Sequence, residues 1–225
     1  MIIAIVFVIG TVAIYFSQTM KKQFNQEVRI GLDRTAGNET DLITEKDLQH
    51  LPEIVQKYLR YAGVPGMQKV RNVHIFLEGR MRGGPDEDWM KIHAEQYSFF
   101  DDPTRVFYIK AKKAGLPVRG IHLYKNEKAI MVVKLLGLFK VVDASGPVMD
   151  QSETVTMFND MCMMAPGTLI DTRIQWEEID SLNVKAVYTN GDHSISAKIT
   201  FNEEGQLVDF ISDDRSELRG KDFVQ

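Results

Sequence analysis

The chain has 225 residues, of which 44% are hydrophobic and 26% charged, a composition typical of a folded protein and not of a disordered one. Its net charge of -4 argues against a general nucleic-acid binder, which needs a basic surface to neutralise phosphates. Cys162 is the only cysteine, which excludes an internal disulfide and a thiolate metal cluster.

Residues 1–20 contain no charged side chain, and the stretch from Ile2 to Phe16 is densely apolar. Twenty helical residues span about 30 Å, which matches the hydrocarbon core of a bilayer. A cleaved signal peptide is the alternative, but its basic N-terminal region and small-residue cleavage site are not clear here. We therefore expect residues 1–20 to form a single-pass transmembrane anchor, with the membrane bilayer as the protein's first partner.

The charges beside this segment bear on the side of the membrane that the protein occupies. Lys21, Lys22 and Arg29 follow the segment, and no basic residue precedes it. The positive-inside rule then favours a cytoplasmic position, although Glu27 lies among these charges.

Residues 21–50 are predicted to form a helical extension and a linker. Phe24, Val28 and Leu32 are spaced by four, so the anchor helix is expected to continue beyond the membrane. The polar stretch 33–41 is typical of a linker. Residues 51–225 are then expected to form one β-rich domain, which begins with a helix between Pro52 and Ala62.

From Val70 onward the sequence alternates between apolar and polar residues, which predicts strands. Tight turns separate them, and Asn190-Gly191 is the strongest hairpin signal. Nine or ten short strands predict a mainly β, α+β fold, built as a curved antiparallel sheet or half-barrel. The predicted strands include 73–77, 89–99, 105–113, 118–124, 129–134, 174–176, 184–188, 195–201 and 207–211.

A mid-chain helix rich in methionine, from Ser152 to Cys162, interrupts the strands. Met157, Met161 and Met164 follow helical spacing, and Phe158 belongs to the same apolar run. Flexible methionine side chains either fill gaps in a core or line a surface that accepts variable apolar ligands. Both interpretations remain open from the sequence.

The candidate ligand-contacting residues combine this helix with aromatic and charged positions of the strands. Glu95 lies inside a predicted strand and would need a partner if it pointed inward, for which Arg80 or Arg82 is available. The histidines and carboxylates show no metal-ligand spacing, so we assign no metal, cofactor or catalytic residue. The candidates are Met157, Phe158, Met161, Met164, Trp89, Glu95 and Trp176.

Several long motifs together resemble an uncharacterised family of bacterial membrane-anchored proteins, a family described only as a domain of unknown function. The motifs are GRMRGGPDEDWMKIHAEQY from Gly79, GLPVRGIHLYKN from Gly115, DASGPVMDQSETVTMFNDMCMMAPGTLID from Asp143 and FNEEGQLVDFISDDR from Phe201. Members of that family extend further, so the resemblance implies that closing strands are missing after Gln225.

At the level of element order, the chain is similar to lipoprotein-carrier half-barrels, which implies an extracytoplasmic position and conflicts with the flanking charges. The leading hypothesis is a non-enzymatic module that binds an apolar or lipid ligand near the membrane. One alternative is a membrane assembly protein that acts through protein contacts. Another is a hydrolase in which Glu95, His93 or Asp160 converge.

Overall fold

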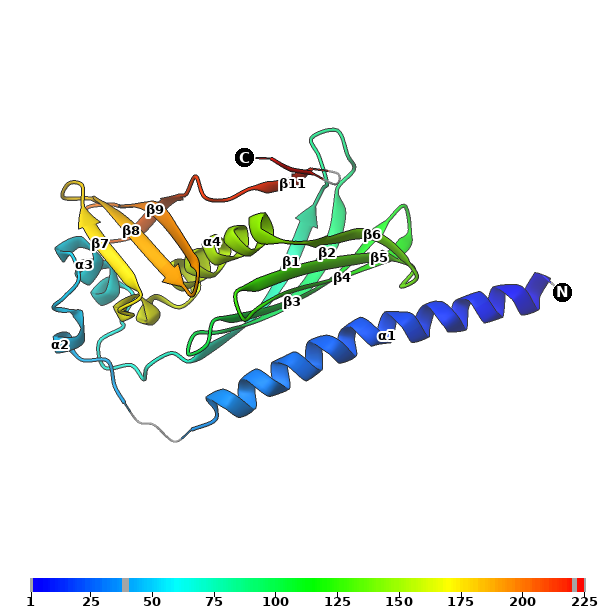
Figure 1. The fold of residues 1–225 in the computed structure, drawn as a ribbon, viewed down its shortest axis with the longest axis horizontal. Helices are drawn as coiled ribbons and strands as arrows, with labels where there is room; N and C mark the ends of the chain where they lie inside the picture. Colours follow the sequence, from blue (N-terminus) through cyan, green and yellow to red (C-terminus); the bar gives the residue numbers. More distant parts are fainter. Residues whose placement is uncertain (1, 38–40, 220–221, 225) are drawn as a thin grey trace.

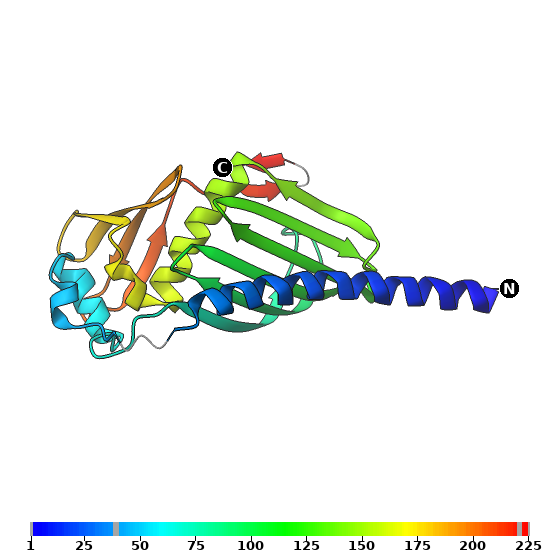
Figure 2. The ribbon, with the colours of Figure 1, turned by 60° about the horizontal axis from the view of Figure 1, so that its bottom comes forward.

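The computed structural model describes residues 2–37, 41–219 and 222–224, and the side chains of 18–37 and 41–216. The described chain is mainly antiparallel β, as predicted, with two main sheets and a helix, α4 (Pro147–Met164), between them (Figure 1). A second long helix, α1 (Ile2–Thr35), runs along the outside of the larger sheet (Figure 2).

The larger sheet, sheet 1, is a meander in which each strand pairs with the next one in the chain. Its hairpin connections at residues 82–89, 114–115 and 136–138 all lie at one end, which we call the tip end. The strands are β1 (Asn72–Met81), β2 (Met90–Phe99), β3 (Thr104–Lys113), β4 (Leu116–Lys125), β5 (Lys128–Leu135) and β6 (Phe139–Ser145).

The remaining strands form a separate sheet, which corrects the prediction of one curved sheet or half-barrel. Because α4 and the short 3-10 helix η1 (Pro166–Ile170) follow β6, the chain leaves sheet 1 before it pairs again. Neither main sheet of the described chain closes into a barrel. Sheet 2 has the order β10-β9-β8-β7, from β7 (Ile174–Glu178), β8 (Asn183–Asn190), β9 (His193–Phe201) and β10 (Leu207–Ile211), and a hairpin of β11 (Glu217–Arg219) and β12 (Asp222–Val224) follows.

Helix α4 extends the predicted helix 152–162 at both ends and is buried along most of its length. Phe158 packs on sheet 2, with its ring centroid 5.3 Å from that of Tyr188 and 5.8 Å from that of Phe210. The short helix α2 (Glu45–Leu48) and α3 (Glu53–Tyr61) close this core, and the Tyr58 hydroxyl donates to the Cys162 carbonyl at 2.6 Å. Because α4 has neighbours on both sides, it buries polar side chains such as Glu153 and Asp160 as well as its apolar ones.

Helix α1 covers the opposite face of sheet 1, which confirms the predicted helical extension. Phe24 and Val28 are buried against Val106, Tyr108 and Ile121. We call this the α1 face, and the side toward α4 the α4 face. Because side chains alternate along a strand, neighbouring residues of β3 belong to different faces.

Ion pairs hold α1 in register with sheet 1. Lys21 contacts Glu95, and Lys125 donates to Glu27 at 2.9 Å. Near the end of the helix, Arg34 donates to Asp101 at 2.9 Å, at the end of the sheet opposite the tips. The N-terminus of α1 therefore points toward the tip end, and Figure 1 shows the helix extending beyond it.

Within the residues that the structure describes, no helix is long and apolar enough to cross a membrane. The anchor predicted for residues 1–20 falls mostly on residues 1–17, whose side chains lie outside those described. It therefore stays a prediction.

Gly31 lies in close contact with sheet 1, because a Cβ atom there would overlap the ring of Phe99. Alanine stabilises an isolated helix by about 1 kcal/mol relative to glycine, whereas overpacking costs about 1–3 kcal/mol. We expect Gly31→Ala to weaken the docking of α1 and to speed amide hydrogen exchange in residues 20–35. Gly79→Ala, where a Cβ would meet open space, should leave this exchange unchanged.

Candidate functional site

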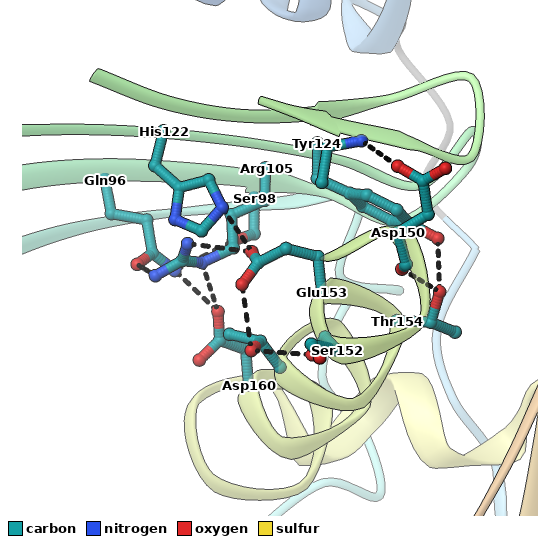
Figure 3. Close-up of polar contacts among 12 residues, drawn as sticks. Gln96, Ser98, Arg105, His122, Tyr124, Asp150, Ser152, Glu153, Thr154 and Asp160 are labelled. Atoms are coloured by element: carbon teal, nitrogen blue, oxygen red, sulfur yellow. Dashed lines mark hydrogen bonds and ion pairs between the residues drawn. The ribbon is translucent and has the colours of Figure 1, made fainter. Parts of the chain in front are cut away.

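The polar groups that α4 buries against sheet 1 form one hydrogen-bonded cluster (Figure 3). Arg105 on β3 donates to Gln96 on β2 at 2.7 Å and to Asp160 on α4 at 3.1 Å, and it lies 3.3 Å from Glu153. Gln96 donates to Asp160 at 2.7 Å. His122 Nε2 on β4 lies 3.4 Å from Glu153 Oε2. One arginine thus pairs with both carboxylates and offsets one of their two negative charges.

Burial controls the protonation of this cluster. Burial lowers the pKa of His122 to about 4; the Glu153 charge opposes this effect, and the Arg105 and Arg215 charges add to it. Burial also raises the pKa of Asp160, an effect that Arg105 and Gln96 offset only in part. His122 is therefore neutral near pH 7. Although Glu153 is nearby, the buried Nε2 atom of His122 has no hydrogen-bond partner among the described residues.

A second polar chain links α4 to both sheets. Asn190 on β8 donates to the Tyr124 hydroxyl at 2.8 Å, and Tyr124 contacts the Thr154 hydroxyl at 2.7 Å. Since Thr154 donates its own proton to the Asp150 carbonyl, Tyr124 must be the donor in their contact. Asp150 in turn accepts from the Ala129 amide at 2.7 Å. Every member of this chain has a partner, so its role is structural.

Beyond the polar cluster, the α4 face of sheet 1 becomes apolar. Two successive cross-strand rows toward the tip end contain only apolar residues or glycine. Helix α4 crosses the opposite end of the sheet and leaves these rows free of helical cover (Figures 1 and 2). We call them the apolar rows: Leu77, Ala94, Ile109, Gly120, Val133 and Val142, followed by Gly79, Ile92, Ala111, Val118, Leu135 and Phe139.

The structure places the residues predicted on the methionine-rich helix mainly in the core. Met157, Phe158 and Met161 are almost completely buried in the core that α4 shares with α3 and both sheets. Met164 at the end of the helix is 38% exposed. The packing therefore matches the core interpretation of this helix.

The other candidates lie elsewhere. Trp89 is 57% exposed at the tip end, where the Arg82 guanidinium lies 4.8 Å from its ring centroid. Trp176 on β7 packs on the core of sheet 2, and its buried Nε1 has no hydrogen-bond partner among the described groups. Trp89 thus lies apart at the tip end, whereas Trp176 packs against the core cluster that also contains Met157 and Met161.

Glu95 lies on the α1 face, and the expectation that Arg80 or Arg82 pairs with it is wrong. Its partners are Lys21 of α1 and His74, whose Nε2 lies 3.2 Å away. Burial would raise the pKa of Glu95, but these two neighbours outweigh it and lower the pKa. Arg80 was considered because, like Glu95, it lies within the run of alternating strand residues. Lys21 lies on another element, 74 residues away from Glu95 in the sequence.

The groups considered for hydrolysis do not converge. Glu95 and His93 lie on the α1 face, and Asp160 approaches sheet 1 from the other side. Among the described residues, no group of three His, Cys, Asp or Glu side chains could hold a metal ion. Burial raises the pKa of the Cys162 thiol, which keeps this cysteine protonated and unreactive.

Sequence reasoning missed Gln96, Arg105 and His122, although one signal was present. Glu153 and Asp160 are seven residues apart, so they share a face of a helix. Two acidic side chains on one face of a helix that has no basic residue indicate a cationic partner on another element if that face is buried. The sequence does not show which strand supplies it.

Replacement of Arg105 by Met should destabilise the protein by about 3–5 kcal/mol, because Glu153 and Asp160 would remain buried without their cation. Chemical denaturation followed by tryptophan fluorescence measures this loss. Adding Glu153→Gln and Asp160→Asn removes the uncompensated charges and should recover most of the stability. A triple variant no more stable than Arg105→Met would contradict this account of the cluster.

His122 should make folding stability depend on pH. Unfolded histidine binds a proton below about pH 6.5, whereas His122 in the folded protein remains neutral down to about pH 4. The unfolded state binds more protons in this interval, so stability is lost as pH falls from 6.5 to 4, by about 3 kcal/mol in full. His122→Gln should lose less stability than the wild type between these pH values in denaturation experiments.

The exposed His50 provides the control, since His50→Gln should retain the pH dependence of the wild type. Asp160 acts in the opposite direction, because its raised pKa favours the folded state as pH falls. It is present in all three proteins and largely cancels in the comparison. Equal pH dependence of the wild type and His122→Gln would contradict the role assigned to His122.

Comparisons with known proteins agree with the resemblance of the motifs. No curated protein and no solved structure matches the chain significantly. A family of unknown function, DUF6544, matches residues 41–225, which include α2, α3, α4 and both sheets. The chain therefore belongs to the DUF6544 family.

Proposed function

We propose that this protein is a non-enzymatic, membrane-anchored module that holds an apolar, lipid-like ligand against the α4 face of sheet 1. The observation that carries the proposal is the pair of apolar rows, which no described helix covers. Most of their larger side chains, such as Ile109 and Val133, are partly buried and remain accessible. Apolar surface of this extent gains free energy when a ligand removes it from water.

The border between the apolar rows and the polar cluster suits a ligand with one polar end. His122 occupies the intervening cross-strand row, between Phe107 and Met131. Its neutral ring carries the Nε2 atom that lacks a hydrogen bond. A buried polar group without a partner costs free energy, which a ligand's polar group would recover. The apolar part of such a ligand would extend from His122 toward the tip end.

The direction of α1 supports a source for this ligand. If residues 1–20 span a bilayer, the tip end of sheet 1 faces the membrane, since α1 runs past it toward its own N-terminus. The apolar rows then lie at the membrane-proximal end of the sheet. A lipid would have a short path from the bilayer to this surface.

Protein contact is the second candidate function, and the edge strand β6 favours it. Phe139 and Val141 on this strand are 62% and 56% exposed. An exposed apolar edge is a common site of association with another chain. The following experiment separates a lipid from a protein on the same surface.

The full chain should be reconstituted in bilayer nanodiscs that contain a phospholipid with a photoactivatable acyl chain. After irradiation, we expect mass spectrometry to find crosslinks on Ile109, Val118 and Val133, because the apolar rows would contact the acyl chain. Crosslinks confined to α1 and the hairpin tips would contradict the proposal. A partner polypeptide on the rows would favour protein contact.

Substitutions on the surface provide the matched control. Ile109→Asp with Val133→Asp should reduce crosslinking of the rows, because a charge in contact with an acyl chain is costly. Val208→Asp changes a 55% exposed apolar residue on β10 of sheet 2 and should have no effect. An equal loss in both variants would indicate general destabilisation and would contradict specific binding.

A further inference from the structure

The α1 face of sheet 1 carries an unbroken row of basic residues across five neighbouring strands, β2 to β6. The register pairs His93 with Lys110, Lys110 with Arg119, Arg119 with Lys134, and Lys134 with Lys140. We call these five residues the basic row. Strands lie about 4.8 Å apart, so the row is about 20 Å long. The chain as a whole, in contrast to this row, has a net charge of -4.

This arrangement places like charges directly opposite each other on neighbouring strands, which destabilises a sheet. The two ends of the row are compensated, because Glu78 lies 3.0 Å from His93 and Asp143 accepts from Lys140 at 2.6 Å. No ion pair among the described residues involves the three central members, Lys110, Arg119 and Lys134.

Outside the basic row itself, the polar and aromatic contacts of Lys110 and Arg119 are with uncharged groups. Arg119 donates to the Val118 carbonyl at 3.2 Å, and the Lys110 amine lies 5.9 Å from the Tyr108 ring centroid. One row further from the tips, the same face pairs its charges, as Lys21 does with Glu95. This face therefore pairs its charges in the row that Lys21 reaches, whereas the three central cations of the next row toward the tips have no ion pair among the described residues.

The position of the row identifies a partner. Lys21 contacts Tyr108 and Glu95, which occupy the row adjacent to Lys110 on the side away from the tips. The basic row therefore flanks α1 near residue 20, where the uncharged segment of the chain ends. Helix α1 brings no negative charge to this position. A helix that enters a bilayer places lipid headgroups at the end of its apolar segment.

We propose that the basic row docks on the headgroups of anionic phospholipids and presses the tip end of sheet 1 onto the membrane surface. Basic residues beside a membrane are attracted by an anionic leaflet and lose that attraction within a Debye length. The exposed apolar side chains at the tips, Trp89 and Leu116, suit the same interface. The acidic loop residues Asp86 and Asp88 set a limit on how deeply the tips enter.

This proposal shares the membrane anchor with the proposed function but does not require a bound ligand. It concerns the α1 face, whereas the ligand would occupy the α4 face. Crosslinking of the apolar rows can therefore fail while docking succeeds, and the reverse is equally distinguishable.

The test compares the full chain in nanodiscs of phosphatidylcholine alone with nanodiscs that also contain phosphatidylglycerol. The variant carries Lys110→Gln, Arg119→Gln and Lys134→Gln. At about 1 kcal/mol for each basic residue, the three substitutions should lower the ratio of docked to undocked protein on anionic discs on the order of 100-fold. Amide hydrogen exchange of residues 108–120 and 132–142 reports this ratio, and high salt should abolish the difference.

Thermal unfolding provides a second readout with opposite signs in the two lipids. In phosphatidylcholine the variant should unfold at a higher temperature than the wild type, because repulsion within the row is relieved. In the anionic discs it should unfold at a lower temperature, because the lipid contacts are lost. A variant less stable in both lipids would show that the row serves the fold alone and would overturn the proposal.

A matched control carries the same loss of charge away from sheet 1, as Lys46→Gln, Lys185→Gln and Lys198→Gln. These lysines are exposed on α2, β8 and β9. The control should retain the protection that the wild type shows on anionic discs. Equal protection of the wild type in both lipids, or an equal loss in the control, would overturn the proposal.

Discussion

The structure depends on the burial of α4 between two sheets. A helix enclosed on both sides must bury its apolar side chains against a neighbour and pair every polar side chain that it buries. Phe158 and Met161 satisfy the first requirement against sheet 2 and α3. Arg105 serves the second, because it forms ion pairs with both carboxylates that α4 presents to sheet 1. These contacts hold one sheet on each side of α4.

The position of α4 also divides sheet 1 into two halves with different roles. Where α4 and α1 cover the sheet, its side chains belong to the core or to ion pairs. Toward the tip end, one face is apolar across all six strands and the other is basic across five. Strand alternation produces both faces from the same segments, such as Ile109-Lys110-Ala111 on β3. An amphipathic half-sheet at one end of a protein suits the border between a membrane and water.

The sequence patterns predicted the elements better than their partners. Period-two alternation located β1–β5 and β7–β10 but not β6, β11 or β12, and helical spacing located α3, α4 and the extension of α1. The same patterns did not predict two sheets, because alternation reports which residues are buried and not which strand pairs with which. Glu95 illustrates the limit, since its partner Lys21 comes from an element far away in the sequence. The methionine-rich helix was correctly located, but only its neighbours decided that Met157 and Met161 belong to the core.

The sequence by itself determined the local features: the uncharged N-terminal segment, the alternation of the strands, the turns and the acidic pair on the central helix. These follow from the chemistry of neighbouring residues and from the fixed periods of helices and strands. The tertiary structure alone decided which cation pairs with that acidic pair, and that Lys110, Arg119 and Lys134 share a row. Such associations depend on strand register, which the chain sets only when distant segments pack together.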